Sequence, residues 1–436
     1  MPSVSLIKLK RINRLALIGC LISSSVFSQN INSPYSRYGL GDLVSSQNIL
    51  TRGMGGLSTA YADFQSINFI NPASYGQLQS VTYDIAVEVD NLSILSKNPV
   101  RKFSNASPVI SYVNLGIPLK KNGGWGLILG LRPVTRIKYK IERSERLTVG
   151  GLDENISTLF EGNGGSQQVY VGTGVKAGKF TFGINAGYLF GSKDYSTRRG
   201  FDNDTVNFFK SNHQTKTNFG GFIFNGGVQY VAKVGKELNL RLGVQGSLKQ
   251  QINGTRDIIR ETFAYDASSA VYTIDSIYYD KDVKGTIQMP ASYSAGFMLD
   301  HNGKWQFGLD YSVSQWGDYR FFNEIDQVKD SWQLRAGGQV IPESGKSYWS
   351  NVAYRAGVSY GYDYVNVGGE MPKWVISVGA GLPMRRVTYT NQFSIINVAA
   401  EFGRRGTKQS IIQENLFQLS VGLSMSDIWF IKRKYD

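Results

Sequence analysis

Residues near the end of the chain alternate strictly between apolar and small or polar side chains. Apolar Leu419, Val421, Leu423 and Met425 are interleaved with Gln418, Ser420, Gly422 and Ser424, and the aromatic pair Trp429 and Phe430 follows. Strands that are apolar on one face only are typical of transmembrane β-barrels. A membrane-spanning helix needs about 18 or more consecutive apolar residues, and no such run occurs after the first 28 residues. The pattern therefore predicts a chain that crosses a membrane with strands.

Similar alternating segments recur along the chain after residue 78. They lie at 81–89, 109–119, 125–141, 167–176, 180–190, 218–233, 238–249, 286–300, 305–319, 332–341, 352–362, 374–384, 393–402 and 416–425. These fourteen segments give the even strand number of bacterial barrels. We expect an all-β fold, a transmembrane antiparallel β-barrel of about 14 strands over residues 79–436.

The connections between these segments fall into two lengths. Short turns are expected at 121–124, 177–179, 234–237 and 301–304, and long loops at 142–166, 191–213 and 250–283. Bacterial barrels place short turns on the periplasmic side and long loops outside. Pro290 interrupts one predicted strand, and because proline lacks a backbone donor we expect a kink or bulge there.

The first 28 residues have the pattern of a secretory signal peptide. Lys8, Lys10, Arg11 and Arg14 precede a short apolar stretch that ends at Phe27, and cleavage is expected after Ser28. Leu17-Ile18-Gly19-Cys20 also matches a lipoprotein cleavage box, which would make Cys20 a lipidated N-terminus. Five residues between Arg14 and Cys20 are too few for the apolar core of such a signal, so ordinary cleavage is preferred.

The composition excludes several classes of function. The only cysteine is Cys20, so the chain after the leader has neither a disulfide nor thiol chemistry. The formal net charge of +14 comes from basic residues spread along the chain, whereas nucleic-acid binding needs them gathered on one element. We therefore expect no nucleic-acid partner. The basic loops suit contact with anionic outer-membrane lipid and lipopolysaccharide.

Residues 29–78 do not alternate. This segment is glycine-rich around Gly53–Gly56, becomes mildly apolar, and turns at Asn71-Pro72. It is too polar for lipid, yet Leu57, Phe64 and Phe69 are among enough apolar side chains to pack, which disordered tails generally lack. We expect a hatch or plug inside the barrel. A disordered periplasmic tail is the alternative.

The order of motifs in this segment resembles the N-terminal hatch of the outer-membrane long-chain fatty acid transporter family (FadL/TodX type). The matching positions are Arg52, Gly53, Gly55, Gly56, Ala60, Ala62, Asp63, Asn71, Pro72 and Ala73. Met289–Tyr293 and Tyr354–Gly357 are similar to later strands of that family. The opening Ser33–Gly39 and the ending Trp429–Lys434 resemble a Bacteroidetes branch of it.

The resemblance implies an integral outer-membrane protein for passive uptake of small hydrophobic compounds through a hatch-gated lumen. In that family the ligand enters from outside, binds in the lumen and leaves through a lateral opening when the hatch shifts. Carried over to this chain, Asn71-Pro72-Ala73 would form the hatch turn, and Phe64, Phe69 and Pro290 are candidates for the ligand path. The sequence departs from the family because its lumen-facing strand positions are mostly polar.

A second function fits those polar positions. The protein could be a non-transporting accessory barrel subunit of an outer-membrane protein secretion or assembly complex, with other outer-membrane proteins as its partners. Aromatic residues of the predicted 250–283 loop could then form an external binding surface; they are Phe263, Tyr265, Tyr272, Tyr278 and Tyr279. An empty general porin is disfavoured by a packed plug.

No catalytic or metal-binding pattern survives inspection of its context. Gly357-Val-Ser359-Tyr-Gly361 matches a nucleophile elbow, but it lies within an alternating strand rather than at a strand-to-helix turn. The two histidines, His213 and His301, lie far apart in sequence, and Asp202-Asn203-Asp204 lacks the rest of a calcium loop. We predict a protein that is not an enzyme and uses no cofactor or metal.

Overall fold

The computed structural model describes most of the chain after the predicted leader. The described residues are 33–97, 100–120, 123–149, 152–202, 209–266, 268, 271–342, 347–384, 392–427 and 429. The predicted signal peptide at 1–28, the alternative lipid site at Cys20, and the tail residues after Trp429 lie outside them.

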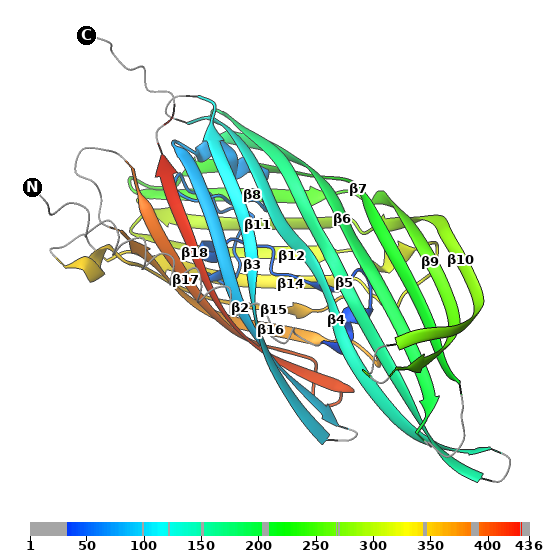
Figure 1. Ribbon diagram of the computed structural model, residues 1–436. Helices are drawn as coiled ribbons and strands as arrows, with labels where there is room; N and C mark the ends of the chain where they lie inside the picture. The colour runs from blue at the N-terminus through cyan, green and yellow to red at the C-terminus, as the bar shows by residue number, and fades with distance from the viewer. Residues whose placement is uncertain are drawn as a thin grey trace, which may run out of the picture.

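Antiparallel strands build one closed sheet (Figure 1). Its long strands are β2 (Val81–Lys97), β3 (Val100–Pro118), β4 (Trp125–Val149), β5 (Leu152–Ala177), β6 (Phe180–Phe201), β7 (Lys210–Lys233), β8 (Leu238–Ser247), β9 (Gln250–Tyr265), β10 (Val271–Met289), β11 (Ser292–His301), β12 (Trp305–Ser314), β14 (Ser331–Val340), β15 (Ala353–Tyr362), β16 (Pro372–Pro383), β17 (Ser394–Arg405) and β18 (Ile412–Asp427). Two-residue strands β1 (Asp42–Leu43) and β13 (Arg320–Phe321) pair with β4 and β10.

Two wall strands are interrupted: β8 and β9 are the two parts of one, and β10 and β11 are the two parts of the other. β7 pairs with β8 over one part of its length and with β9 over another. β10 continues into β11 across Pro290 and Ala291, where strand pairing is interrupted. Counted this way, the wall has fourteen strands, and β18 pairs with β2 to close it. The predicted transmembrane barrel and its strand number are confirmed.

The outer surface carries the apolar band that a bilayer requires. Outward side chains such as Val421 on β18, Val378 on β16 and Phe182 on β6 are exposed although they are apolar. Aromatic groups border the band: Trp332 contacts Tyr311, Tyr360 and Tyr362 at one rim. Among the described residues, no helix is long and apolar enough to cross a membrane.

The three segments predicted as long loops are in fact extensions of the wall strands, and that prediction was wrong. Residues 142–166 complete the β4–β5 hairpin, residues 191–213 lie largely in β6 and β7, and residues 250–283 form most of β9 and β10. About 9–11 residues suffice for a strand to cross the hydrocarbon layer. Beyond it both faces of a strand can be solvated, so the alternation that marks membrane strands fades while the hydrogen-bonded ladder continues.

Strands β3 and β4 pair only from Val113–Leu131 to Pro118–Gly126. We call the unpaired part of this boundary, beyond Val113 and Leu131, the seam. Along the seam, β3 pairs with β2 alone, whereas β4 pairs with β5 and with the two residues of β1. Figure 1 shows the β2–β3 and β4–β5 hairpins diverging from this point.

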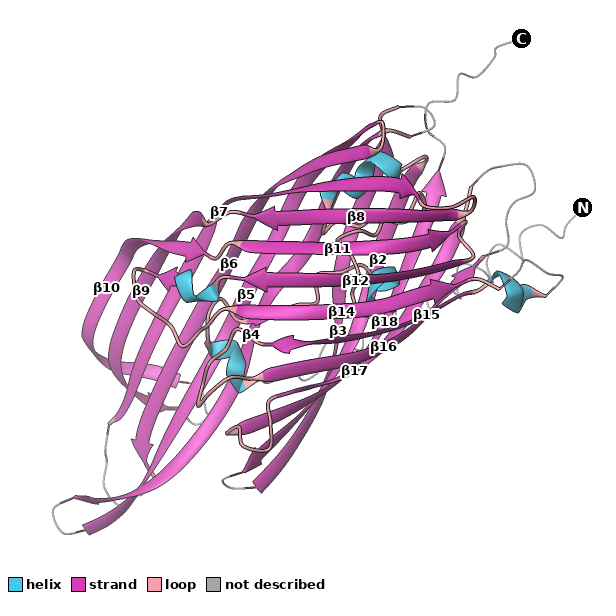
Figure 2. Ribbon diagram, turned by 180° about the vertical axis from the view of Figure 1, so that it is seen from behind, coloured by secondary structure: helices cyan, strands magenta, loops and turns pink. Residues whose placement is uncertain are grey.

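The segment from Ser33 to Leu78 runs through the inside of the barrel (Figures 1 and 2). It contains the short helix α2 (Ile49–Arg52) and the 3-10 turns η1 (Pro34–Arg37) and η2 (Pro72–Gln77). The α2 helix contacts β16, β17 and β18, while η2 contacts β4 to β7. Its apolar side chains, including Leu40, Leu57 and Ile67, are fully buried. The hydrophobic core of the molecule is therefore the interface between this inner segment and the wall.

Candidate functional site

The centre of the barrel is organised around α2. Asn48 caps the helix, because its Oδ1 accepts a hydrogen bond of 2.9 Å from the Thr51 backbone amide. The Tyr112 hydroxyl of β3 lies 3.1 Å from the Ile49 amide and accepts its hydrogen bond. These contacts fix the first turn against the wall and aim Arg52, the last residue of α2, across the lumen.

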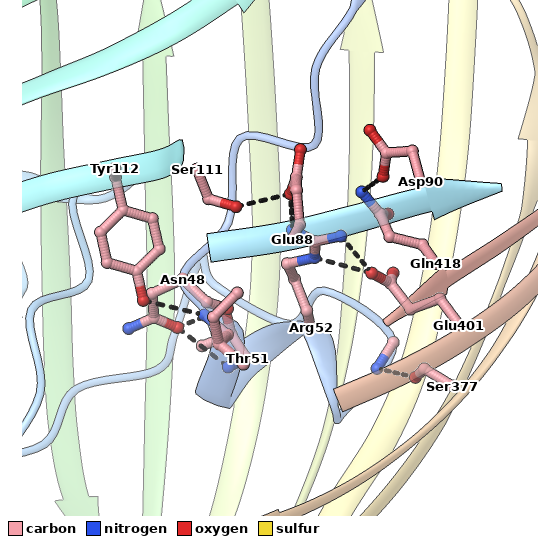
Figure 3. Close-up of polar contacts among 12 residues, drawn as sticks. Asn48, Thr51, Arg52, Glu88, Asp90, Ser111, Tyr112, Ser377, Glu401 and Gln418 are labelled. Carbon is pink, nitrogen blue, oxygen red and sulfur yellow. Dashed lines mark hydrogen bonds and ion pairs between the residues drawn. The ribbon is translucent and has the colours of Figure 1, made fainter. Parts of the chain in front are cut away.

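Arg52 joins the inner segment to two separate wall strands (Figure 3). Its Nη1 lies 2.6 Å from Glu88 Oε2 on β2, and its Nη2 lies 2.6 Å from Glu401 Oε2 on β17. The side chains of Arg52 and Glu88 are 1% and 0% exposed. Burial alone would lower the pKa of Arg52, but Glu401 and Glu88 outweigh it and hold that pKa above its usual value. Arg52 is therefore a permanently charged anchor.

Two further arginines form ion pairs inside the barrel, one with a partner of Arg52 and one in a separate cluster. Arg136 of β4 spans the seam and binds Glu88 Oε1 and Asp90 Oδ2 of β2, each at 2.5 Å. Arg405 of β17 binds three carboxylates: Asp42 at 2.7 Å, Asp363 at 2.9 Å and Glu414 at 3.3 Å. Asp42 belongs to the inner segment, so this second cluster ties a different part of it to the wall.

The predicted glycines of the hatch motif lie against glycines of the wall. Gly55 has a φ of +74° and its amide donates to Ser377 Oγ at 2.8 Å. A Cβ placed on wall residue Gly357 would lie 2.2 Å from the Gly55 nitrogen, and one on Gly337 would lie 2.4 Å from the Met54 carbonyl oxygen. Gly53 packs against Gly379 in the same way, and Gly56 contacts Arg335. Backbone therefore touches backbone here, which only glycine allows.

The Asn71-Pro72-Ala73 turn sits on a second group of wall glycines. The Asn71 side chain is fully buried; its Nδ2 donates to the Thr59 carbonyl at 2.6 Å and its Oδ1 accepts from the Ala73 amide at 3.1 Å. A Cβ on Gly183 of β6 would lie 2.2 Å from the Pro72 carbonyl carbon. This turn is thus wedged against β6 at the end of the barrel that carries the short turns.

The remaining predicted site residues are spread through the structure. Asp63 accepts hydrogen bonds from the Tyr61 hydroxyl and the Gln65 amide, both at 3.1 Å. Phe64 is 45% exposed, whereas Phe69 is buried against Tyr112 and Tyr170. Pro290 lies at the break between β10 and β11. The structure does not gather Phe64, Phe69 and Pro290 around one space.

A cavity of about 600 Å³ lies between the inner segment and the barrel wall. It is bounded by residues 42–47, by β2 with Glu88 and Asp90, and by a serine-rich wall from β11, β12, β14 and β15. Arg335 projects from β14, where Nη1 donates to Ser312 Oγ at 2.9 Å and Nη2 binds Gln333. This lining combines charged and polar groups with apolar side chains such as Leu43, Val109 and Ile137, so it is less polar than the sequence pattern of lumen-facing positions suggested.

The nucleophile-elbow pattern has a structural explanation. Ser359 lies within β15 and is buried, and the pattern's Gly357 is one of the glycines under the hatch turn. His213 is paired across β6 and β7 with Thr197, while His301 stacks on Trp305 at a ring distance of 5.5 Å. Neither histidine is near Ser359 in the strand order. Within the described residues no group of three or more His, Cys, Asp or Glu could hold a metal ion.

The sequence matches one protein-family model over nearly its whole length. The model is described as BamG, and it covers residues 9–436. The chain belongs to the BamG family. A search of curated proteins gave no match for this BamG family member.

Solved structures show which fold the BamG family member shares. A CymD monoaromatic hydrocarbon channel is 13% identical, with a TM-score of 0.53, over 90% of this chain and 100% of the other. A Pseudomonas aeruginosa FadL homologue is 12% identical, with a TM-score of 0.54, over 88% and 98%. The Pseudomonas putida toluene transporter TodX is 14% identical, with a TM-score of 0.53, over 89% and 100%. The fold is therefore that of the FadL/TodX barrels, as the sequence resemblance implied.

Sequence reasoning located the motif residues of the inner segment but missed their partners. Glu88 and Glu401 lie on the polar faces of ordinary alternating strands, where a charged residue also fits a water-filled lumen. The wall glycines were equally inconspicuous among 49 glycines. The available signal was Arg52 itself, because an arginine within a segment predicted to be packed needs a carboxylate partner.

Proposed function

We propose that this BamG family member is a non-transporting accessory barrel subunit of an outer-membrane protein secretion or assembly complex. In this proposal it is integral to the outer membrane, with its short turns in the periplasm and its long hairpins at the cell surface. The observation that carries the proposal is the attachment of the inner segment by buried ion pairs.

A moving hatch would have to break those pairs. Arg52 and Glu88 are both almost completely buried. Removing one partner of a buried ion pair typically costs about 3–5 kcal/mol of stability, and a moving hatch would separate the same two charges. Arg405 and its three carboxylates would have to separate as well. These ion pairs therefore support a role in which the inner segment stays fixed inside the barrel.

The cavity chemistry points in the same direction. A site for a hydrocarbon is mostly apolar with few polar groups. Here carboxylates, arginines and serine hydroxyls line the 600 Å³ cavity together with apolar side chains, and a hydrocarbon would have to displace water from the charged groups without replacing their hydrogen bonds. The charged groups therefore disfavour a hydrocarbon in their part of the cavity.

The β9–β10 hairpin offers a surface for a protein partner. β8 and β11 already contribute ten residues each, enough to cross the hydrocarbon layer, so β9 and β10 extend beyond it. Ile277, Tyr278 and Tyr279 are 68%, 51% and 55% exposed. Exposed aromatic and aliphatic side chains clustered outside the membrane are a mark of protein interfaces. Phe263, by contrast, is 1% exposed and belongs to the interior, so its predicted place in an external surface was wrong.

Mild detergent extraction of the tagged protein from its native membrane tests this function. Mass spectrometry of the purified material should detect other outer-membrane proteins in fixed stoichiometry and no stoichiometric apolar small molecule. A lone barrel that carries such a molecule would refute the accessory role.

Passive uptake of a small hydrophobic compound is the second candidate function. It is favoured by the shared fold with hydrocarbon channels and by the β3–β4 seam, which could serve as a lateral exit. In that case Asn71-Pro72-Ala73 would move with the hatch, and Phe64, Phe69 and Pro290 would line the path. Toluene uptake into proteoliposomes discriminates the two functions, because the accessory role predicts no uptake above that of protein-free vesicles.

A further inference from the structure

The β3–β4 seam lies within the lipid-facing band. Ile110 on β3 is paired with Val87 on β2, and both are exposed on the outer surface. The last β3–β4 pair, Val113 with Leu131, is likewise outward and apolar. The two free strand edges therefore begin at a depth where hydrocarbon surrounds the wall.

Both edges carry features that keep them from pairing with each other. Pro108 on β3 and Pro133 on β4 each remove a backbone donor. Irregularities in pairing occur beside them, between Ala86 and Val87 in the β2–β3 ladder and between Pro133 and Thr135 in the β4–β5 ladder. Prolines and bulges at strand edges prevent edge-to-edge pairing. These prolines and irregularities therefore keep the seam open as part of the wall structure.

The inner segment covers one side of the seam only. Asp42 and Leu43 pair with Arg136 and Thr135 of β4, and the Val44 amide donates to the Val134 carbonyl at 3.0 Å. Leu43 is 46% exposed and also lines the 600 Å³ cavity, and Val109 of β3 lines that cavity from the opposite edge. The cavity thus reaches the seam from inside, between residues 42–47 and β3.

The cavity holds groups of both charge signs with unused binding capacity. The single guanidinium of Arg405 is shared by Asp42, Asp363 and Glu414, so one cation faces three carboxyl groups. Both Glu414 oxygens already accept hydrogen bonds, from Ser33 and Arg405, so further donors would bind at Asp42 and Asp363. Arg335 on the far wall donates to the neutral acceptors Ser312 and Gln333. It also stands opposite Asp310 across the β12–β14 ladder, but its printed hydrogen bonds go to neutral oxygens, so its guanidinium can still bind an anionic oxygen. Cavities of about 300–1,000 Å³ accommodate small molecules.

We propose that this cavity binds the zwitterionic headgroup of a membrane lipid, which enters through the β3–β4 seam while its acyl chains remain in the bilayer. A polar chamber next to a lipid-facing opening fits an amphipathic molecule, whereas a hydrocarbon would leave the charged lining unsatisfied. The phosphate binds at the Arg335 wall and the amine at the carboxylates around Arg405. This inference stands whether the protein is an accessory subunit or a transporter.

Native mass spectrometry of the intact purified barrel tests the proposal. The protein is exchanged into detergent with defined amounts of phosphatidylethanolamine or phosphatidylglycerol, and the retained lipid is counted. Phosphatidylethanolamine should be retained at one copy, with affinity about tenfold or more above that for phosphatidylglycerol. Glycerophosphoethanolamine, the same headgroup without chains, should bind far more weakly because nothing anchors it at the seam.

Two variants and one control locate the binding. Val109→Trp should obstruct the inner mouth of the seam and Arg335→Gln should remove the phosphate contact, each lowering retention about tenfold. Val87→Trp places the same ring on the outer surface beside the seam and should leave retention unchanged. Heat-modifiable gel mobility confirms that each variant is folded.

Three results would overturn the proposal. Equal retention of both lipids would mean that only surrounding lipid is carried along. Unchanged retention in both Val109→Trp and Arg335→Gln would place the lipid elsewhere. Equal binding of glycerophosphoethanolamine would make the cavity a site for a soluble solute.

Discussion

Arg52 is the residue on which the inner segment most depends. It is buried among oxygen atoms of Glu88 and Glu401, which come from strands on either side of the β2–β18 closure. Placing a charge there is costly unless it is fully paired. The pairing fixes the segment in one position, since a shift along the barrel axis would separate Arg52 from both carboxylates and leave Glu88 with Arg136 alone.

Arg52→Ala is expected to lower the free energy of unfolding by about 3–5 kcal/mol, because it removes the arginine partner of Glu401 and leaves Glu88 with Arg136 alone. Urea unfolding followed by tryptophan fluorescence measures this change. Arg143→Ala is the matched control: the Arg143 side chain is 70% exposed, so its loss should change stability by less than about 0.5 kcal/mol. Equal effects of the two substitutions would contradict the anchoring role.

Gly357 makes a second prediction at this scale. Its Cβ position is 2.2 Å from the Gly55 nitrogen and from the Met54 carbonyl carbon, so Gly357→Ala should push the hatch turn off the wall. Faster cleavage near Met54 in limited proteolysis is the expected result. Gly226→Ala on β7 is the control, because the nearest atom to its Cβ position is 3.6 Å away. Unchanged cleavage in Gly357→Ala would show that the contact is dispensable.

At the scale of elements, each long hairpin contains strand segments of two kinds: those within the bilayer and those beyond it. The membrane part of each strand alternates because one face meets lipid and the other meets the lumen. The parts beyond the bilayer have no such constraint, so β9 and β10 were read from the sequence as a loop. Tertiary pairing with β7 supplies the ladder that local pattern could not predict.

The inner segment illustrates the opposite case. The sequence predicted a plug with a turn at Asn71-Pro72, because apolar residues in a polar segment must be buried somewhere. The contacts of Arg52 and Gly55 with β2 and β15 were not, since they join residues far apart in sequence. A single sequence carries no information on which wall strand faces which part of the segment.

The β9–β10 hairpin makes a prediction that separates binding from folding. The double substitution Ile277→Ser and Tyr279→Ser should leave unfolding unchanged within about 0.5 kcal/mol, since both side chains are exposed. It should nevertheless abolish co-purification of partner proteins, as quantified by mass spectrometry. Retention of the full partner set would remove this hairpin from the interface.

Phe263→Ser tests the same hairpin from its inner face. Phe263 is 1% exposed, and removal of a buried aromatic ring typically costs about 3–5 kcal/mol. This variant should therefore lose stability, as urea unfolding would measure. If it unfolded at the wild-type urea concentration, the assignment of Phe263 to the interior would be wrong.

At the scale of the whole molecule, the protein is a FadL/TodX-like barrel whose inner segment is attached to the wall by ion pairs. The overall fold is shared with the FadL and TodX structures. In the lumen, arginine clusters hold the inner segment, and charged, polar and apolar groups surround the remaining space. In the proposed accessory role, the outer surfaces matter more than flow through the centre.

Hydrogen exchange of the protein in lipid nanodiscs tests the central claim, that the inner segment is a fixed part of the barrel. Mass spectrometry should find the amides of residues 48–56 and 71–77 as slow to exchange as those of wall strands β15 and β16, because both would open only on global unfolding. Exchange of these inner residues within seconds, while β15 and β16 stay protected, would reveal a mobile hatch and contradict the account.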